Sequence, residues 1–234
     1  MKRIFTLFLV LLILLNVSCS YKEESSATIN VNEKIVFGHQ NGKPLTWITI
    51  YDHNHTKILL SEKILDVKKY NEKEEKHDWD KTTLYEYLNS DFVNEHFTSE
   101  EKDKMTYTND VDNDLVTMLT LDNLLDLYDH MNYVKDGYYG DKDYFAANDK
   151  IVAKPSELAL YNEIDVFDNE VMAQIMRTEV DHRYDFANGC AGYWILNQLD
   201  DVANAYYVTP TGYIGNTPVN TDYIGIRPVI RIKS

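Results

Sequence analysis

The C-terminal end of the chain constrains the fold more than any other stretch of the sequence. Residues 193–196, 205–208, 213–215 and 224–232 are short runs rich in Tyr, Ile and Val, a composition that is typical of β-strands. We predict that these runs are the closing strands of one sheet, with Trp194 as a large core side chain. The preceding chain must then pack against that sheet.

Further strands are predicted near the N-terminal end of the body. Residues 32–37 form one candidate strand, and residues 45–51 and 57–61 form a hairpin in which polar and apolar side chains alternate. We expect the strand that contains Trp47 to pair with the closing strand. Thr-Pro-Thr-Gly at residues 209–212 predicts a turn between two of the later strands.

The middle of the chain has helical patterns. Thr83 followed by Glu86 has the spacing of a capping box and predicts a helix start. The apolar residues that follow share one helical face: Leu84, Tyr87, Leu88 and Phe92. Further helices are predicted after Thr98, Thr120 and Pro155 and over residues 171–176, where the apolar spacing is amphipathic. The charged residues 63–76 have no period and are predicted to form a loop. The fold class is therefore α+β, with strands at both ends of the body.

The N-terminal residues have the pattern of an export signal. Lys2 and Arg3 precede an apolar run over residues 4–15, which is too short to span a bilayer and fits a signal peptide. Cys19 follows a small residue, as in the lipid-attachment site of bacterial lipoproteins. Plain secretion, with cleavage near Ser18 or Ser20, is the alternative.

These features divide the chain into three parts. We predict a signal peptide over residues 1–18, a lipidated cysteine with a flexible tether over residues 19–31, and one domain over residues 32–234. The predicted location is the cell envelope, with the protein anchored in the outer membrane or at the cell surface. The net charge of −15 repels phosphates and excludes a nucleic-acid partner.

Five segments resemble a bacterial domain family of unknown activity. They are Trp47-Ile48-Thr49, Leu-Leu-Ser-Glu-Lys-Ile-Leu-Asp at residues 59–66, Thr-Thr-Leu-Tyr-Glu-Tyr-Leu-Asn at 82–89, Tyr-Trp-Ile-Leu at 193–196, and Gly-Ile-Arg-Pro-Val at 225–229. The family pattern has Arg where this chain has Tyr85 and Leu196, so any polar role of those two arginines is missing here.

The resemblance implies a fold similar to C-type lectins and formylglycine-generating enzymes. In such a fold a small mixed or antiparallel sheet joins the termini, and two or more helices and a long looped hairpin surround it. The structural core residues expected on this basis are Trp47, Leu84, Leu88, Trp194, Arg227 and Pro228. No activity comes with the resemblance.

Three patterns in the sequence resemble metal or catalytic sites in part. Residues 110–114 begin like an EF-hand loop, but Leu115 and Leu121 stand where Gly and Glu are required. His53 and His55 could share a metal at a hairpin tip, but no third ligand is identifiable. Cys190 with His182 allows a nucleophile and a base, although a small buried residue is the commoner role for a lone cysteine. We therefore expect no metal and no cofactor.

Tyrosines are the candidate ligand-binding residues. Exposed tyrosine offers flat apolar area and a hydroxyl group, which suits the recognition of carbohydrate or protein. The residues selected on this basis are Tyr138, Tyr139, Tyr144, Tyr213 and Tyr223. The predicted function is a non-catalytic binding module on an envelope lipoprotein. The alternatives are a thiol- or metal-dependent enzyme and a structural surface lipoprotein.

Overall fold

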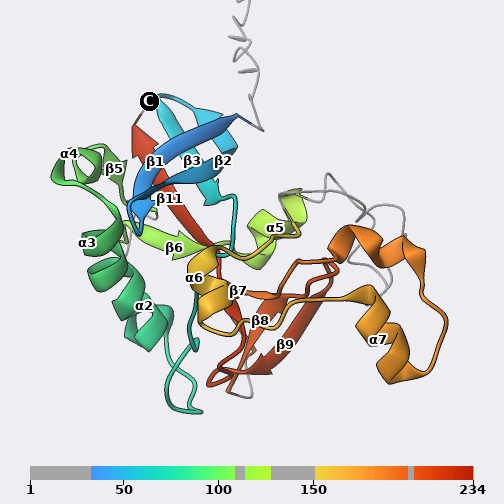
Figure 1. Cartoon of the computed structure of the whole chain (residues 1–234). Helices are drawn as coiled ribbons and strands as arrows, with labels where there is room; N and C mark the ends of the chain where they lie inside the picture. The colour runs from blue at the N-terminus through green and yellow to red at the C-terminus, as the bar shows by residue number, and fades with distance from the viewer. Residues whose placement is uncertain (1–32, 109–113, 128–150, 200–202, 234) are drawn as a thin grey trace, which may run out of the picture.

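The chain folds into two β-sheets with helices packed beside them (Figure 1). A computed structural model describes residues 33–108, 114–127, 151–199 and 203–233. The predicted signal peptide, Cys19 and the tether lie outside the described residues. The predicted α+β class is confirmed. None of the helices in the described ranges is long and apolar enough to cross a membrane.

The first sheet joins the two ends of the body. Its order is β1-β2-β3-β11-β5, and β6 also pairs with β11. All of its pairs are antiparallel. The strands are β1 (Lys34–Gln40), β2 (Lys43–His53), β3 (Thr56–Ser61), β5 (Met105–Thr106), β6 (Val116–Met118) and β11 (Pro228–Lys233).

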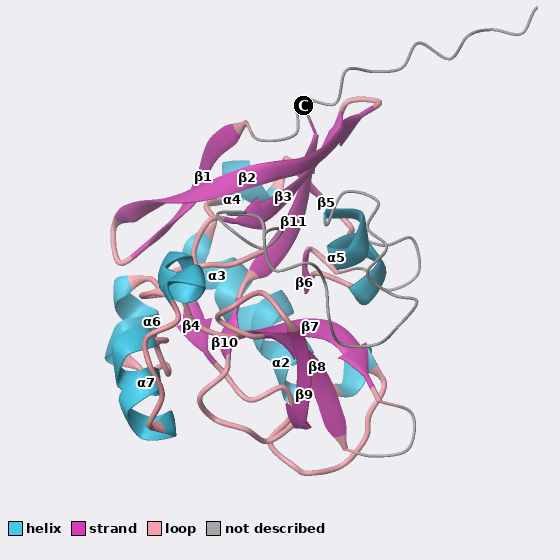
Figure 2. Cartoon of the chain, turned by 90° about the vertical axis from the view of Figure 1, so that its right-hand side faces the viewer, coloured by secondary structure: helices cyan, strands magenta, loops and turns pink. Residues whose placement is uncertain are grey.

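The second sheet lies below the first in Figures 1 and 2 and has the order β4-β10-β7-β8-β9. Only the pair of β10 with β7 is parallel. The predicted turn at residues 209–212 is confirmed, because Gly212 N–H donates to the carbonyl of Thr209. The strands are β4 (Asp66–Val67), β7 (Tyr193–Gln198), β8 (Asn204–Val208), β9 (Ile214–Pro218) and β10 (Gly225–Ile226).

The prediction that the closing strands form one sheet was wrong. β7 to β10 belong to the second sheet, whereas β11 belongs to the first. The chain changes sheets at Arg227, between β10 and β11. β11 pairs with β3, so one strand separates it from the strand that contains Trp47. The hairpin of β2 and β3 was predicted correctly.

Helices follow the capping residues, with one correction. The cap of the helix at residue 83 is Thr82, whose hydroxyl accepts from Tyr85 N–H, and not Thr83. The capping box of Thr98 and Glu101 is confirmed. The helices are α2 (Thr83–Tyr87), α3 (Val93–His96), α4 (Ser99–Lys102), α5 (Leu121–Leu127), α6 (Glu157–Tyr161) and α7 (Asn169–Met176), with a π turn at Leu88–Phe92 between α2 and α3.

Two clusters of buried side chains hold the sheets and helices together. Trp47, Trp194, Leu84 and Leu88 lie in the first cluster, which spans both sheets and the α2–α3 helices. The second contains Leu60, Tyr193, Ile195 and Val208. Leu59 and its neighbour Leu60 point to opposite faces of β3 and belong to different clusters. The first sheet is therefore buried on both faces at these two positions of β3.

Burial on both faces also corrects the prediction for β2. Trp47, Ile48 and Thr49 are all buried, although the alternation in β2 predicted one exposed face. The loop predicted over residues 63–76 is confirmed apart from the short strand β4, although Asp66 and Tyr70 are buried there. Their polar atoms are satisfied: Tyr87 Oη donates to Asp66, and Tyr70 Oη donates to the carbonyl of Leu196.

His96 ties α3 to β1 as a neutral ring. Its Nδ1 lies 3.0 Å from the carbonyl of Phe92, and its Nε2 lies 3.4 Å from the side-chain nitrogen of Gln40. A carbonyl can only accept, so Nδ1 carries the hydrogen and Nε2 accepts from Gln40. Burial lowers the pKa of His96, while the Phe92 carbonyl and the Glu95 carboxylate oppose that shift.

This lowered pKa predicts a loss of stability in mild acid. The unfolded chain, with a histidine pKa of about 6.5, binds the proton more tightly than the folded chain. The stability that depends on the neutral His96 ring is therefore fully present above about pH 6.5. It decreases as the pH falls towards the lower pKa of His96 in the folded chain. Urea unfolding from about pH 7.5 to about pH 5.5 should show a steeper loss for the wild type than for His96→Gln. Parallel curves for the two proteins would contradict the assignment.

Candidate functional site

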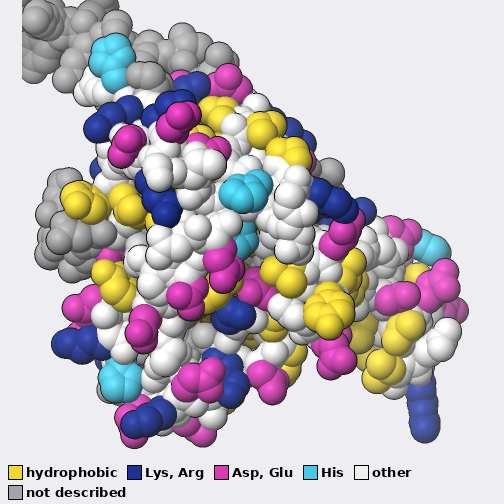
Figure 3. Space-filling view, turned by 60° about the vertical axis from the view of Figure 1, so that its left-hand side comes forward, with side chains coloured by type: hydrophobic (Ala, Val, Ile, Leu, Met, Phe, Trp, Pro, Cys, Tyr) yellow, Lys and Arg dark blue, Asp and Glu magenta, His cyan; other side chains and the backbone are white. Residues whose placement is uncertain are grey.

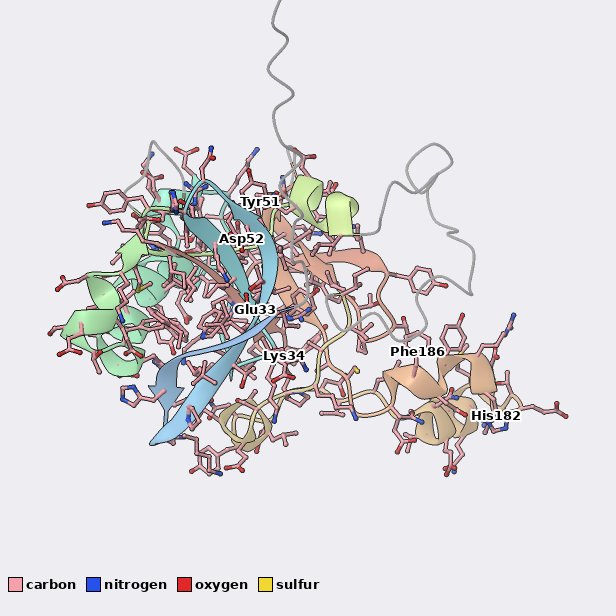
Figure 4. The ribbon with its side chains drawn as sticks, turned by 90° about the horizontal axis from the view of Figure 1, so that it is seen from above. Glu33, Lys34, Tyr51, Asp52, His182 and Phe186 are labelled. Carbon is pink, nitrogen blue, oxygen red and sulfur yellow. The ribbon has the colours of Figure 1, made fainter. Side chains whose placement is uncertain are left out.

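The candidate site is a groove beside α7, in a lobe that stands at one side of the molecule. Asp168 starts this helix, because its carboxylate accepts from the backbone N–H groups of Glu170 and Val171. The helix ends at Arg177, which adopts a left-handed conformation with φ 55°. Figure 4 shows His182 and Phe186 in the same lobe, away from the strands that carry Tyr51 and Asp52.

A buried asparagine fixes the segment after α7. The side chain of Asn169 donates to the carbonyl of Asp181 at 2.9 Å and to the carboxylate of Asp185 at 2.8 Å. Those two residues belong to the short 3₁₀ helix η4 (His182–Ala187) and its cap. The first turn of α7 is thereby tied to η4. The hydrogen bond from Phe167 N–H to the carbonyl of Cys190 joins the lobe to the chain entering β7.

The groove lies between α7, the chain leading into η4, and the turn that joins β8 to β9. It encloses about 420 Å³. Its lining is mostly apolar or aromatic, and its polar members include two carboxylates. The lining residues are Phe167, Asn169, Met172, Ala173, Met176, Thr178, Glu179, Asp181, Tyr184, Thr211 and Tyr213.

The amphipathic helix predicted over residues 171–176 is present as α7, and its apolar residues are exposed. Val171, Met172, Ile175 and Met176 are 47%, 38%, 69% and 65% exposed. Ala173 and Asn169 are the residues of the helix that are buried. The apolar surface of α7 is thus continuous with the groove, because Met172 and Met176 belong to both.

The charge around the groove is negative. Residues 165–185 contain six carboxylates and two guanidinium groups, those of Arg177 and Arg183. Arg183 forms an ion pair with Asp181. The pKa of Asp185 is lowered, first by its hydrogen bond from Asn169 and then by His182. In Figure 3 acidic side chains are interspersed with apolar ones over the visible surface.

The structure separates the predicted tyrosines. Tyr213 is half-buried and lines the groove. Tyr223 is 49% exposed but is not among the lining residues. Tyr138, Tyr139 and Tyr144 lie outside the described residues.

Sequence reasoning missed the other residues of the groove. Tyr184 lies in the short 3₁₀ helix η4, which no periodic pattern in the sequence predicts. Met172 and Met176 were placed on an amphipathic helix, but an amphipathic period does not tell whether the apolar face meets the core, a ligand or solvent. The sequence signal that could have located this lobe is a pair of capping carboxylates. Asp168 caps α7, and Asp181 caps η4.

The candidate catalytic residues are not arranged for chemistry. Cys190 is buried, and burial raises the pKa of its thiol. His182 is exposed and pairs with Asp185. His55 is exposed in the turn between β2 and β3. Within the described ranges, no three histidine, cysteine or carboxylate side chains are grouped as a metal site.

Burial predicts slow alkylation of Cys190. The folded chain should react with iodoacetamide at this thiol at least about tenfold more slowly than the chain in urea, because reaction requires local opening and a thiolate. Mass spectrometry of the peptide that contains Cys190 measures both rates. Equal rates in the two conditions would restore the thiol-enzyme alternative.

A second hollow lies beside the first sheet. It encloses about 270 Å³ between the β1–β2 turn and the start of α6. An ion pair between Lys43 and Glu157 lies among its lining residues. Its lining residues carry both signs of charge and include no aromatic side chain, so it offers a ligand less distinctive chemistry than the groove beside α7.

The fold and the groove define an α+β protein with a mostly apolar groove edged by carboxylates. The chain belongs to the family of the domain of unknown function DUF6273, whose family model matches residues 54–234. This agrees with the resemblance to a domain family without an assigned activity. Among curated proteins and among solved structures, none matches the chain.

Proposed function

We propose that this protein is an exported lipoprotein whose body is a non-catalytic binding module. The groove beside α7 takes the ligand, which is a carbohydrate or a protein. Cys19 carries the lipid that anchors the module in the cell envelope, and residues 20–31 act as the tether.

The observation that carries the proposal is the exposure of the groove and of the α7 surface continuous with it. Apolar side chains on soluble proteins are normally scattered, and a contiguous exposed group of them marks a binding surface. Here Val171, Met172, Ile175 and Met176 are exposed on one short helix, and Tyr184 and Tyr213 lie opposite. The capping bonds of Asp168 and Asn169 hold this surface in place without a ligand.

A C-type-lectin-like fold is part of the proposal. Two features support it: β1 and β11 lie in one sheet, so the two ends of the body meet, and the helices α2 and α3 pack beside that sheet (Figure 1). A single domain over residues 32–234 is supported by the first core cluster, which contains side chains from both sheets.

A binding screen with matched variants tests the module. Immobilised glycans and short peptide pools are the probes, and Met176→Gln is compared with Leu160→Gln. Both side chains are exposed, at 65% and 53%, but Leu160 lies on α6 outside the groove. The affinity for a ligand should fall about tenfold in Met176→Gln and should be unchanged in Leu160→Gln. If no probe binds, or if the two variants lose the same affinity, the proposal is contradicted.

The anchor is tested separately. Mass spectrometry of the mature protein should find a diacylglyceryl-modified Cys19 at the N-terminus, and Cys19→Ala should release the protein from membranes. A mature N-terminus beyond Cys19 would contradict the lipid anchor without affecting the groove.

A further inference from the structure

The polar groups of the groove are few and mostly engaged, which bears on the class of its ligand. Asn169 donates both side-chain bonds to Asp181 and Asp185. The hydroxyl of Thr211 bonds to that of Thr209. A sugar needs several side chains that can bond its hydroxyl groups, because each buried hydroxyl left without a partner costs binding free energy.

Glu179 is the available charge of the groove. Asp181 is engaged with Arg183, whereas Glu179 has no cation at ion-pair distance in the part of the chain that the structure describes. Its carboxylate is exposed beside the thioether and aromatic side chains of the lining. An ammonium or guanidinium group placed there would meet an opposite charge, and the faces of Tyr184 and Tyr213 would add cation–π attraction.

The apolar part of the groove suits side chains and not a fixed small molecule. Met172 and Met176 are unbranched and polarizable, so they adapt to ligands of different shape. They are continuous with Val171 and Ile175, which extend the apolar surface beyond the groove along α7. A ligand that covers both regions needs a row of apolar groups with cationic groups beside them.

From this lining and charge we infer that the ligand is a basic, partly apolar peptide segment of a partner protein. Its apolar side chains lie over Met172, Met176 and Tyr213, and a Lys or Arg pairs with Glu179. The six carboxylates and two guanidinium groups of residues 165–185 leave the surroundings net negative, which favours the approach of a cation. This inference rests on the proposed function, since it names the ligand of the same groove.

Three labelled peptide pools test the inference on the mature protein. Each pool has apolar positions randomised among Leu, Ile, Met and Phe, and the intervening positions are all Lys, all Gln or all Glu. Fluorescence anisotropy should rank the affinities Lys above Gln above Glu, with about a tenfold preference for Lys over Gln at low salt. The preference should decrease as salt is raised.

Two carboxylate variants test whether Glu179 is the source of the preference for the Lys pool. Glu179→Gln should reduce the Lys-to-Gln ratio about threefold, whereas Glu100→Gln, an exposed carboxylate on α4 outside the groove, should not change it. Equal effects of the two variants, or a Glu pool that binds as well as the Lys pool, would overturn the inference. If a glycan binds the wild type and Met176→Gln abolishes that binding, the peptide inference is overturned while the proposed binding module is supported. If no peptide pool and no glycan depends on Met176, both proposals fail.

Discussion

Replacement of Gly225 by alanine is expected to destabilise the fold by about 3 kcal/mol. A methyl group there would overlap Cγ2 of Ile64 and would lie 2.8 Å from Cδ1 of Ile164 and 3.2 Å from the carbonyl of Gly192. Gly225 sits in β10 between β4 and β7, so neighbours on both sides are held by strand pairing and cannot move apart cheaply. Urea unfolding followed by circular dichroism measures the change.

Gly42 is the control for this substitution. An added methyl group at Gly42 would have no atom within 4 Å, although its φ of +74° makes alanine strained. Gly42→Ala should therefore cost about 1 kcal/mol, clearly less than Gly225→Ala. If both variants lost the same free energy of unfolding, the close approach between β10 and its neighbours would be wrong.

Loss of the Arg227 side chain is expected to destabilise the fold by about 4 kcal/mol. The guanidinium group is buried where the chain changes sheets. Its Nε donates to the carbonyl of Ser61 at 3.0 Å, and its Nη1 lies 3.3 Å from both the carbonyl of Ile151 and the hydroxyl of Tyr193. Arg227→Ala would remove the guanidinium donor from the carbonyl of Ser61 and the hydroxyl of Tyr193 and would open a cavity, although the carbonyl of Ile151 would still accept from Tyr193 Oη.

A second substitution separates the two causes. Arg227→Met fills most of the cavity but restores no donor, so it should recover part of the loss and leave about 2 kcal/mol. Lys43→Ala, which removes an exposed ion pair with Glu157, should leave the unfolding midpoint unchanged. An Arg227→Ala variant as stable as wild type would show that the guanidinium group does not join the sheets.

The sequence predicted strands and helices where side-chain period and capping residues were strong. The β2–β3 hairpin, the capping box of Thr98 and the turn before Tyr213 all depend on neighbours in sequence, and all are present. The division of the closing strands into two sheets depends on long-range pairing. No local pattern in residues 225–228 indicates that β10 pairs with β4 while β11 pairs with β3.

The groove was predictable only in small part. Tyr213 was selected as a tyrosine near the last strands, since exposed tyrosine suits recognition, and it does line the groove. The helix of Met172 and Met176 was recognised, but its partner was not, because an apolar helix face has the same pattern whether it meets a core or a ligand. The position of η4 depends on the buried bonds of Asn169, which joins residues separated along the chain.

The most direct test of the binding groove uses methyl groups of methionine. Met172 and Met176 are exposed beside the groove, whereas Met105 and Met118 are buried in the first core cluster. In protein labelled with ¹³C at the methionine methyl groups, the tightest probe of the screen should shift the signals of Met172 and Met176 and leave those of Met105 and Met118 in place. Binding that leaves Met172 and Met176 unmoved would contradict the groove as the ligand site.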